Sequence, residues 1–528
     1  MSVNRRKHNF DVVDPLARRP RQGDADGGLR KPLRVVKFGG TSVADAACIG
    51  KAVEIIRNTS RETGVVVVVS AMSGVTNDLI EAATQSEAGE RDLVASIFEK
   101  LRAQHEAAVS GLIESPAERD RISAKMRECL QEGERLCQGT ILLRELTLRA
   151  RDSISSLGER LLAPLVAAAL SERGVLSEAI EANELVVTDS CHGAADPRMD
   201  LTKERCQQRL RPLLQRGIVP VVTGFIGATE ESVLTTLGRG GSDYSATILG
   251  AALNADEVII WTDVDGLMTS DPRLVPGACT IPEISYREAA ELAHFGAKVL
   301  HPKTLRALMP CGIPLWIRNT FAPERPGTKI TPKGPANGAG VTALAAISDA
   351  ALITVGGPGI VGVPDVLGRT FATTTAIQAD VLLISQSSSQ NEICLVVSSA
   401  CAKRTVEALR REFAQDLAHE KMEHVTLDPT VAIIAVVGQN MRGVSGIVSR
   451  TFGVLGRENV NIIAIAQGAS ECNISFVVAR REMKAALVAA HREFQLGALN
   501  SQVLPLASGD TRTGSWYHES EHLSADAD

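Results

Sequence analysis

The stretch LRVVKFGGTSVADAACIGKAV, residues 33–53, carries the pattern from which the fold can be deduced. A short β-branched run ends at Val36, and a lysine, two glycines and two hydroxyl residues follow before a helical pattern begins. Glycines between a strand and a helix often let the backbone approach a phosphate group. In the familiar phosphate loop the lysine follows the glycines, whereas Lys37 precedes Gly39 and Gly40 here. Two interpretations stay open: an ordinary strand–turn–helix, in which the glycines serve only the turn, or an unusual phosphate site. Thr41 or Ser42 would also cap the helix that begins near Val43.

The composition describes a globular chain. Its 528 residues suffice for about three domains of roughly 150 residues each. With 44% apolar and 22% charged residues it can bury a sizeable core, and the net charge is only 56 − 62 = −6. This balance disfavours a broad nucleic-acid surface, and an aromatic content of 3% disfavours a stacking platform for single strands. No nucleic-acid partner is expected.

The cysteines and the two ends of the chain bear on its location. The ten cysteines include no C-x-x-C pair, and such scattered thiols fit a reducing cytosol. The longest apolar runs, such as residues 65–69, are too short to span a bilayer, so no membrane contact is expected. Residues 1–32 lack the apolar segment of a secretory signal and are expected to form a flexible extension, as are residues 508–528. An organelle-targeting segment is the alternative for the arginine-rich start, but its aspartates favour a cytoplasmic protein.

Residues 33–333 show an α/β pattern. Nearly continuous apolar runs at 65–70, 217–225 and 256–263 predict buried strands, and segments of helical periodicity separate them. This alternation predicts a mostly parallel sheet covered by helices, in which ligands bind beyond the carboxyl ends of the strands. The motifs KFGGTS, SAMSGVTN and TDVDG all follow predicted strands. The site is therefore expected at that edge of the sheet.

The C-terminal part contains an internal repeat. A Pro/Gly-rich break predicts a linker at 334–343, and the chain then repeats itself with a spacing of 81 residues (450 − 369, 467 − 386 and 474 − 393). Two copies of about 80 residues suggest duplicated α+β modules, because a solenoid needs more repeats. The expected bounds are 344–425 and 426–507.

Two further motifs place charged residues beside helices. In TLGRGGSDYSATILGAAL (236–253), glycines surround Arg239, and Ser242 and Asp243 follow at the start of an apolar helix. A glycine-preceded helix N-terminus binds anions, and an arginine there can hold a carboxylate or phosphate in bidentate fashion. Asp243 could hold a substrate ammonium group or a metal, or could merely cap the helix. In SLGERL (156–161), Glu159 lies in an otherwise apolar helix, where it needs a cationic partner unless it is partly exposed.

The motif WTDVDGLMTSDPR (261–273) carries two carboxylates at a predicted strand end. Such a pair suits magnesium or nucleotide contacts. A tight Asp-Gly turn accounts equally well for Asp265 and Gly266. Asp263 is less easily explained by the turn.

Taken together, these motifs resemble those of the aspartokinases. KFGGTS, SAMSGVTN, SLGER, TLGRGGSDYSA, WTDVDG followed by DPR, and FGAKVLHP occur in the order found in that family, and the resemblance covers residues 33 to 506. The kinase portion of bifunctional aspartokinase–homoserine dehydrogenases is the most similar, notably in AIAQGASE. No dinucleotide-binding fingerprint follows the repeats, so a monofunctional enzyme is expected. The resemblance implies an α/β fold: a three-layer αβα amino-acid-kinase (carbamate-kinase-like) domain followed by two ferredoxin-like α+β ACT modules.

The implied reaction transfers the ATP γ-phosphoryl group to the side-chain carboxylate of L-aspartate, giving 4-phospho-L-aspartate and ADP. This is the first step of the aspartate-family pathway to lysine, threonine and methionine. A carboxylate with a pKa of about 4 is already ionised at neutral pH, so no general base is needed. Positioning and dispersal of phosphoryl charge are then the catalytic tasks, which explains a lysine beside glycine N–H groups.

The resemblance also implies residue roles. Lys37 and Asp243 would be catalytic, and aspartate would be bound by Ser70, Thr76, Glu159, Arg239 and Ser242. ATP, as its Mg²⁺ complex, would contact Lys37, Gly39, Gly40, Thr41, Thr262, Asp263, Met268, Arg273, Lys298 and Val299. Met268 stands where relatives often have a tyrosine near the adenine, which would alter nucleotide packing. No resident metal site is expected.

The ACT modules imply feedback regulation by an amino acid. Gln386 and Gln467 match the glutamines of threonine-sensitive relatives, which favours threonine over lysine as the effector. Gln390 stands where relatives usually have glutamate, so lysine stays an alternative. ACT modules commonly pair their sheets, which implies a homodimer or a larger assembly. The rival functions are another acyl kinase of the same fold, such as glutamate or acetylglutamate kinase, and a non-catalytic amino-acid sensor.

Overall fold

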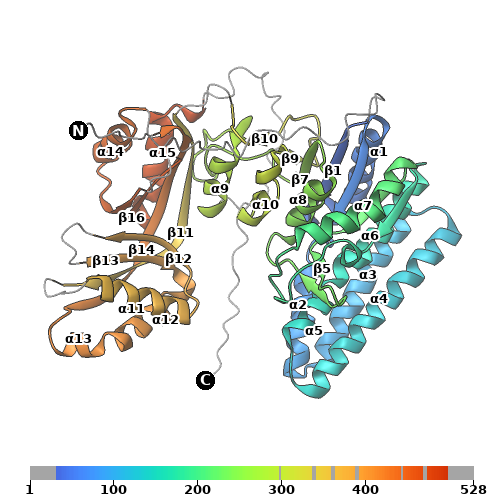
Figure 1. The fold of residues 1–528 in the computed structure, drawn as a ribbon, viewed down its shortest axis with the longest axis horizontal. Helices are drawn as coiled ribbons and strands as arrows, with labels where there is room; N and C mark the ends of the chain where they lie inside the picture. The colour runs from blue at the N-terminus through green and yellow to red at the C-terminus, as the bar shows by residue number, and fades with distance from the viewer. Residues whose placement is uncertain are drawn as a thin grey trace, which may run out of the picture.

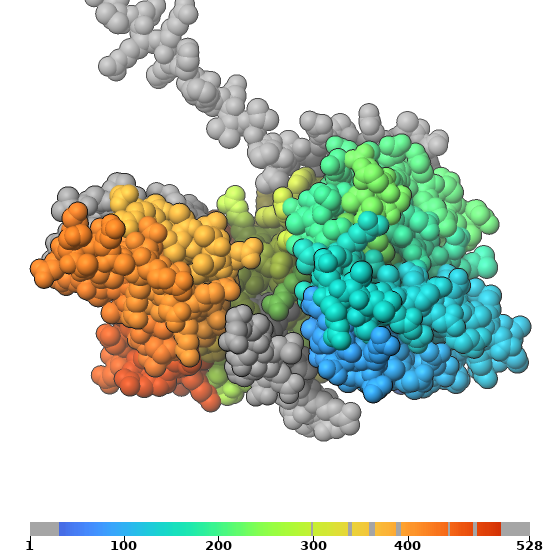
Figure 2. Space-filling view, turned by 90° about the horizontal axis from the view of Figure 1, so that it is seen from below, coloured from blue at the N-terminus to red at the C-terminus, as the bar shows by residue number. Residues whose placement is uncertain are grey.

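The computed structural model describes residues 31–296, 299–335, 340–357, 363–386, 392–441, 444–467 and 472–497. Most of the expected N-terminal extension, all of the tail and the candidate Lys298 lie outside these residues. An α/β portion and a C-terminal sheet portion lie side by side, with the segment around α9 (Tyr286–His294) and α10 (Pro302–Arg306) between them (Figure 1). Figure 2 shows the same two lobes from below, with the segment that joins them in yellow-green.

An eight-stranded sheet forms the centre of the α/β portion. Its order is β3-β4-β2-β1-β7-β9-β10-β8; the strands from β3 to β9 are parallel, and β10 runs antiparallel to β9. Because β1, β2 and β7 are parallel neighbours, the residues that follow them meet at one edge of the sheet. The bounds are β1 (Leu33–Phe38), β2 (Gly64–Val69), β3 (Ser177–Ile180), β4 (Val219–Thr223), β7 (Glu257–Thr262), β8 (Glu283–Ser285), β9 (Leu315–Asn319) and β10 (Thr328–Thr331).

Helices cover both faces of this sheet, as the continuous apolar strands require. In β2, Val66 and Val68 pack on one face and Val65, Val67 and Val69 on the other, so each strand contributes to two separate cores. The first core includes α7 (Met199–Gln215), α8 (Gly241–Leu253), α9 and α10. The second includes α1 (Ala46–Glu62), α2 (Val75–Ala88), α3 (Arg91–Leu112), α4 (Pro116–Leu143), α5 (Leu148–Ser155) and α6 (Leu157–Glu172). The expected three-layer αβα arrangement is confirmed.

One helical segment, Leu148–Glu172, is long and apolar enough to cross a membrane by length and composition. It comprises α5 and α6, and 89% of its most apolar window is buried inside the fold. Its apolar character is therefore explained by the second core, which contains Leu161, Leu165 and other residues of α6.

The C-terminal portion is a six-stranded antiparallel sheet of order β12-β13-β11-β14-β16-β15. The long strands β11 (Gly340–Gly356) and β14 (His424–Gln439) pair along most of their length. Residues 340–347 of β11 pair with the part of β14 whose other edge pairs with β16. Residues 350–356 of β11 pair with β13. The two expected modules thus share their central strands, and the proposed bounds near residue 425 stay a prediction. The remaining strands are β12 (Val381–Gln386), β13 (Glu392–Ser398), β15 (Ile462–Ala466) and β16 (Asn473–Ala479).

The 81-residue repeat recurs in side-chain contacts. Arg369 Nε donates to Glu412 Oε1 at 2.7 Å, and its guanidinium lies 4.5 Å from the centre of the Phe413 ring. In the second copy Arg450 Nε donates to Glu493 Oε1 at 3.0 Å and lies 4.6 Å from the Phe494 ring. The helices concerned are α11 (Val363–Ala376), α12 (Ser399–Glu412), α14 (Ile447–Arg457) and α15 (Met483–Glu493), with the short α13 (Ala414–Ala418) after α12. The expected pair of ferredoxin-like modules is confirmed.

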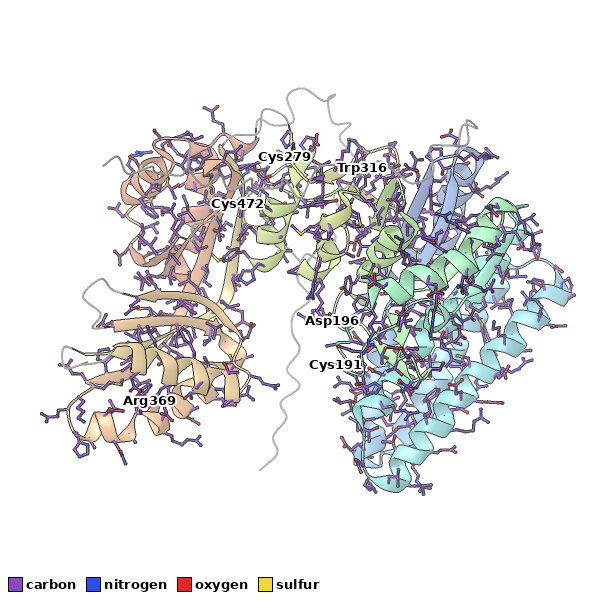
Figure 3. All side chains as sticks on the ribbon, viewed as in Figure 1. Cys191, Asp196, Cys279, Trp316, Arg369 and Cys472 are labelled. Carbon is purple, nitrogen blue, oxygen red and sulfur yellow. The ribbon has the colours of Figure 1, made fainter. Side chains whose placement is uncertain are left out.

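The two portions meet through polar contacts. Oγ1 of Thr269 and Nε2 of His491 on α15 are 2.9 Å apart, and both side chains are buried. Cys279, at the junction in Figure 3, donates its Sγ–H to the Leu496 carbonyl at 3.2 Å. On α9, Glu291 accepts a hydrogen bond of 3.0 Å from the Asn473 side chain. The C-terminal portion therefore contacts both the loop after β7 and the helix α9.

Candidate active site

Lys37 lies in β1, and the two glycines after it let the backbone pass close to the Lys37 amine and to the Ala71 carbonyl. The lysine is 8% exposed. A Cβ added at Gly39 would lie 3.2 Å from the Lys37 amine, and one at Gly40 would lie 3.2 Å from the Ala71 carbonyl. These distances are shorter than ordinary van der Waals contacts, so a side chain at either position would displace its neighbour. The glycines bring the backbone close to the amine as well as making the turn.

The expected helix cap after the glycines is wrong. Residues Gly40–Val43 form a short 3-10 helix, and α1 begins only at Ala46, where Asp45 accepts the N–H of Cys48 at 2.8 Å. Ser42 instead pairs its hydroxyl with that of Thr320 at 2.7 Å. The helix therefore starts after Asp45, three positions later, while Thr320 engages the Ser42 hydroxyl.

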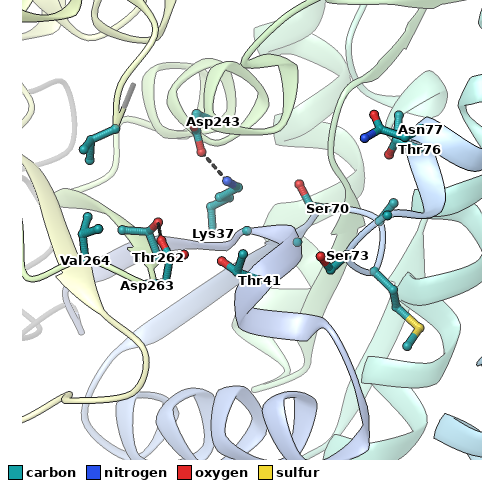
Figure 4. A pocket seen from close by; sticks show the side chains of 16 residues that line it. Lys37, Thr41, Ser70, Ser73, Thr76, Asn77, Asp243, Thr262, Asp263 and Val264 are labelled. Atoms are coloured by element: carbon teal, nitrogen blue, oxygen red, sulfur yellow. Dashed lines mark hydrogen bonds and ion pairs between the residues drawn. The ribbon is translucent and has the colours of Figure 1, made fainter. Parts of the chain in front are cut away.

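Two cavities open beside Lys37. The first, of about 430 Å³, is lined by Lys37, Gly39, Gly40, Thr41, Ser70, Ala71, Met72, Ser73, Gly74, Thr76, Asn77, Asp243, Thr262, Asp263, Val264 and Val299 (Figure 4). The second, of about 640 Å³, is lined by Lys37, Ser70, Thr76, Asn77, Ile80, Leu148, Arg151, Asp152, Ser155, Glu159, Gly193, Phe225, Thr236, Gly238, Arg239, Gly240, Gly241, Ser242 and Asp243. Lys37, Ser70, Thr76, Asn77 and Asp243 line both cavities. Two ligands bound in the two cavities would therefore meet at these five residues.

Lys37 and Asp243 form an ion pair at this meeting point. Lys37 Nζ lies 2.5 Å from Asp243 Oδ1, and the dashed line in Figure 4 marks the contact. The two side chains are only 10% and 15% exposed, so water screens the pair weakly. Asp243 is in the first turn of α8, where the helix dipole favours a negative charge.

Glu159 is a buried carboxylate in the second cavity. It is 3% exposed in α6, and burial raises its pKa to about 8, against the opposing effects of backbone N–H groups, the Lys37 charge and the Ser242 hydroxyl. Its Oε2 has no hydrogen-bond partner within the described part of the chain. A buried oxygen without a partner is unfavourable, so a cationic ligand group in the second cavity would satisfy it.

Arg239 projects from a loop of special backbone geometry. Gly238 and Gly240 on either side have φ angles of +78° and +70°, which favour glycine. The loop leads directly into α8 at Gly241. The exposed guanidinium and the N-terminus of α8 form a region suited to a carboxylate.

The two carboxylates after β7 have different environments. Asp263 lines the first cavity and accepts the Thr262 hydroxyl at 3.2 Å. Asp265 is held by the Asn319 amide at 2.7 Å and by Arg325, and Gly266 next to it has a φ of +135°. The turn interpretation therefore accounts for Asp265, whereas Asp263 faces the cavity.

Three candidate residues are placed elsewhere or lie outside the described part. Met268 lines a small cavity between the loop after β7 and the C-terminal sheet, together with Leu344 and Leu487. Arg273 pairs with Asp271 at 2.7 Å and lines neither of the two site cavities. Lys298 lies outside the described residues. The roles of these residues in nucleotide binding stay predictions.

Sequence reasoning overlooked several residues that line the cavities. Asn77 belongs to the quoted motif SAMSGVTN, so its signal was available. Asp152 lies seven residues before Glu159 and is 2% exposed, but nothing in RARDSIS alone indicated burial. Thr236 ends the short strand β6 (Leu234–Thr236) and Gly193 lies in a loop, and only the fold brings them together at the second cavity.

Comparisons with known proteins agree with this arrangement. The amino acid kinase family model matches residues 32–319, and the ACT domain model matches residues 353–413 and 434–494. Bifunctional aspartokinase/homoserine dehydrogenase 1 of Arabidopsis thaliana is 34% identical over 88% of this chain and 51% of its own length. Aspartokinase 1 of the same plant is 32% identical over 87% of this chain and 80% of its own length. The chain thus spans about half the length of the bifunctional relatives.

Solved structures give the same result. Escherichia coli aspartokinase III in complex with aspartate and ADP (R-state) superposes with a TM-score of 0.74 at 30% identity, covering 88% of this chain and all of that one. The lysine and aspartate complex of the same enzyme (T-state) has a TM-score of 0.72 at 30% identity, covering 87% and 99% of the two chains. With its kinase and ACT regions matched in order, the chain belongs to the amino acid kinase family and, within it, to the aspartokinases.

Proposed function

We propose that this protein is an aspartate kinase, which transfers the γ-phosphoryl group of ATP to the side-chain carboxylate of L-aspartate and yields 4-phospho-L-aspartate and ADP. The observation that carries the proposal is the meeting of two cavities at the ion pair of Lys37 and Asp243. A phosphoryl donor in one cavity and an acceptor in the other would place the transferred group beside the lysine. The relative whose structure contains aspartate and ADP has the same fold.

The second cavity suits an α-amino acid. Arg239 would hold its α-carboxylate, and the unpartnered oxygen of Glu159 would accept its ammonium group. Ser70, Thr76 and Ser242 supply hydroxyl groups around the remainder of the molecule. The side-chain carboxylate would then point toward Lys37, where the two cavities meet.

The first cavity suits a triphosphate. Gly39, Gly40 and Thr41 would contact the phosphates, and Thr262, Asp263 and Val299 line the same cavity. ATP would enter as its magnesium complex, so the ion is part of the substrate. Lys37 would neutralise the transferring phosphoryl group, and Asp243 would hold the amine in place before the substrates arrive.

No general base is required in this mechanism. The attacking carboxylate is ionised at neutral pH, so the protein has only to bring two anions together and stabilise the charge of the transition state. Lys37 and backbone N–H groups after β1 would perform that task.

We infer that the C-terminal sheet binds an amino-acid effector, with threonine favoured over lysine. Gln386 ends β12 and Gln467 follows β15, and both residues are exposed. These two edge strands touch, since the Ser385 hydroxyl donates to the Ile465 carbonyl at 2.8 Å. The two glutamines therefore lie at the ends of equivalent strands of neighbouring repeats, which favours a joint role. Assembly as a homodimer or larger oligomer and a cytoplasmic location remain part of the proposal.

The test is an ATP-dependent hydroxamate assay. Aspartate should give product, whereas glutamate and acetylglutamate should not. Absence of product with aspartate from folded protein that binds ATP would favour the sensor function, and product with another acid would identify a different acyl kinase. Inhibition by threonine and lysine, added singly and together, would then identify the effector. Calorimetry that detects no heat of binding with either amino acid would contradict the proposed regulation.

A further inference from the structure

Asp152 is the most completely hydrogen-bonded carboxylate beside the second cavity, and the proposed reaction does not use it. It is 2% exposed in α5. Its Oδ2 accepts from His192 Nδ1 at 2.7 Å, from the Gly193 N–H at 3.1 Å and from the Thr236 N–H at 3.3 Å. Its Oδ1 accepts from the Thr236 hydroxyl at 2.6 Å. With four donors to two oxygens, this carboxylate is satisfied by the protein itself and has little capacity left for a ligand.

This environment contrasts with that of Glu159. Both carboxylates are buried and both line the second cavity, but Glu159 has an oxygen without a partner. A ligand would therefore pair with Glu159, whereas Asp152 holds protein segments together. Its effect on a ligand has to be indirect.

The segments that Asp152 joins are those that carry the ligand-binding groups. Thr236 is the last residue of β6 (Leu234–Thr236) and lies three residues before Arg239. The loop of residues 189–196 lies against the same region, since the Ala195 N–H donates to the Thr236 carbonyl at 2.9 Å. A Cβ at Gly238 would lie only 2.8 Å from the Gly193 carbonyl. The loop, whose residues Cys191 and Asp196 are labelled in Figure 3, therefore restricts where Arg239 can be placed.

Asp152 is also coupled to Glu159 through the helices. The Ser156 N–H donates to the Asp152 carbonyl at 3.0 Å, and α6 begins at the next residue, Leu157. The Asp152 side chain therefore holds the Arg239 loop against the end of α5, and the main chain of α5 continues directly into the helix that carries Glu159. The separation between these two groups determines whether both ends of an amino-acid head group can be bound together.

We propose that Asp152, with His192 and Thr236 as its partners, is a positioning residue that sets the geometry of Arg239 and Glu159 for the α-amino-acid head group. The inference rests on the proposed function, because it takes aspartate as the ligand of the second cavity. Asp152 does not touch the reacting atoms. Its loss should weaken binding of the amino acid and leave binding of ATP unchanged.

The test compares Michaelis constants in the hydroxamate assay. Asp152→Asn places an amide N–H₂ group against hydrogen-bond donors from which the carboxylate accepts. We expect KM for aspartate to rise at least tenfold and KM for ATP to stay within twofold. A displacement of about 1 Å in a positioning group can reduce rates a hundredfold. Glu288→Gln is the matched control: Glu288 is 1% exposed and accepts from the Ser285 N–H, the Ser285 hydroxyl and the Thr342 hydroxyl, but lines neither site cavity. This control should lower the melting temperature and leave KM for aspartate within twofold.

A second pair of variants keeps the test valid if Asp152→Asn does not fold. Thr236→Val removes the hydroxyl and should raise KM for aspartate, whereas Thr236→Ser keeps the hydrogen bond and should restore most of the affinity. Equal rises in both Michaelis constants, or a KM for aspartate within twofold in both Asp152→Asn and Thr236→Val, would overturn the inference. Wild-type protein that forms no product from aspartate would instead refute the proposed function, and this inference with it.

Discussion

The amine of Lys37 lies 2.5 Å from Oδ1 of Asp243, at the point where the two cavities of the site meet. The lysine comes from the end of a central strand, and the aspartate comes from the first turn of α8. Two rigid elements therefore place a paired charge between the proposed donor and acceptor. Substrate binding would offer the lysine phosphoryl oxygens in addition to the carboxylate.

Replacing this lysine should mainly affect turnover. In Lys37→Ala we expect kcat to fall by at least about a hundredfold, because removal of one preorganised donor to a transition state typically costs a factor of 10² to 10³. Steady-state kinetics with both substrates saturating is the measurement, and Lys51→Ala on α1, which lines neither cavity, is the matched control. Near-normal kcat in Lys37→Ala would remove the lysine from the mechanism.

The buried Glu159 predicts a pH dependence of stability. Its pKa is raised to about 8 in the folded protein, compared with 4.5 for an ordinary glutamate. Between these values the folded state holds a proton that the unfolded state releases. The stabilisation from this group is thus fully present below about pH 4.5 and is lost as the pH rises through about 8.

The variant Glu159→Gln isolates this effect, because glutamine does not titrate. We expect its melting temperature, relative to that of the wild type, to rise by several degrees between about pH 6 and pH 8, since about 1 kcal/mol corresponds to roughly 2–4 °C in a domain of 150–250 residues. Scanning calorimetry in buffers across this range makes the comparison. A difference that stays constant with pH would show that Glu159 is already ionised in the folded protein.

The hydrogen bond between Thr269 and His491 predicts a connection between the ACT portion and the nucleotide side of the site. Thr269 lies in the loop that begins with Asp263 and Val264 of the first cavity. Loss of the imidazole in His491→Ala should loosen this loop, and we expect KM for ATP to rise about threefold or more with KM for aspartate unchanged.

His105→Ala is the control for this prediction. His105 is also buried and bonded, through Nδ1 to the Leu101 carbonyl at 2.7 Å, but it lies on α3 and lines neither cavity. Both variants should lose thermal stability, and only His491→Ala should change KM for ATP. Equal Michaelis constants in the two variants would show that the contact is purely structural.

The sequence was most informative where the residues of a motif are neighbours along the chain. KFGGTS runs from the end of β1 into the 3-10 helix, whereas SLGER and SDY lie at the starts of α6 and α8, and Lys37, Glu159 and Asp243 indeed line the site cavities. The 81-residue spacing likewise predicted the duplicated modules. In the structure, Arg369 and Arg450 make equivalent contacts in the two copies.

Features that depend on distant segments could not be predicted in this way. Asp152 becomes important only because the fold brings Gly193 and Thr236, 41 and 84 residues away in sequence, to its two oxygens. The shared central strands of the ACT portion are a second case, since the pairing of residues 340–347 with β14 leaves no local pattern. The cap of α1 was missed for a different reason: Ser42 and Asp45 are both good caps, and tertiary contact with Thr320 engaged the serine.

The most direct test of the central claim is to identify which carboxylate of aspartate becomes phosphorylated. The protein would be incubated with ATP, Mg²⁺ and L-aspartate, the acyl phosphate reduced with borohydride, and the amino alcohol identified by mass spectrometry against standards. Phosphorylation of the side chain predicts homoserine as the reduction product, with none formed when ATP is omitted or when Lys37→Ala is used. Recovery of 3-amino-4-hydroxybutyrate would show transfer to the α-carboxylate, and absence of any reduced product would contradict acyl-phosphate chemistry altogether.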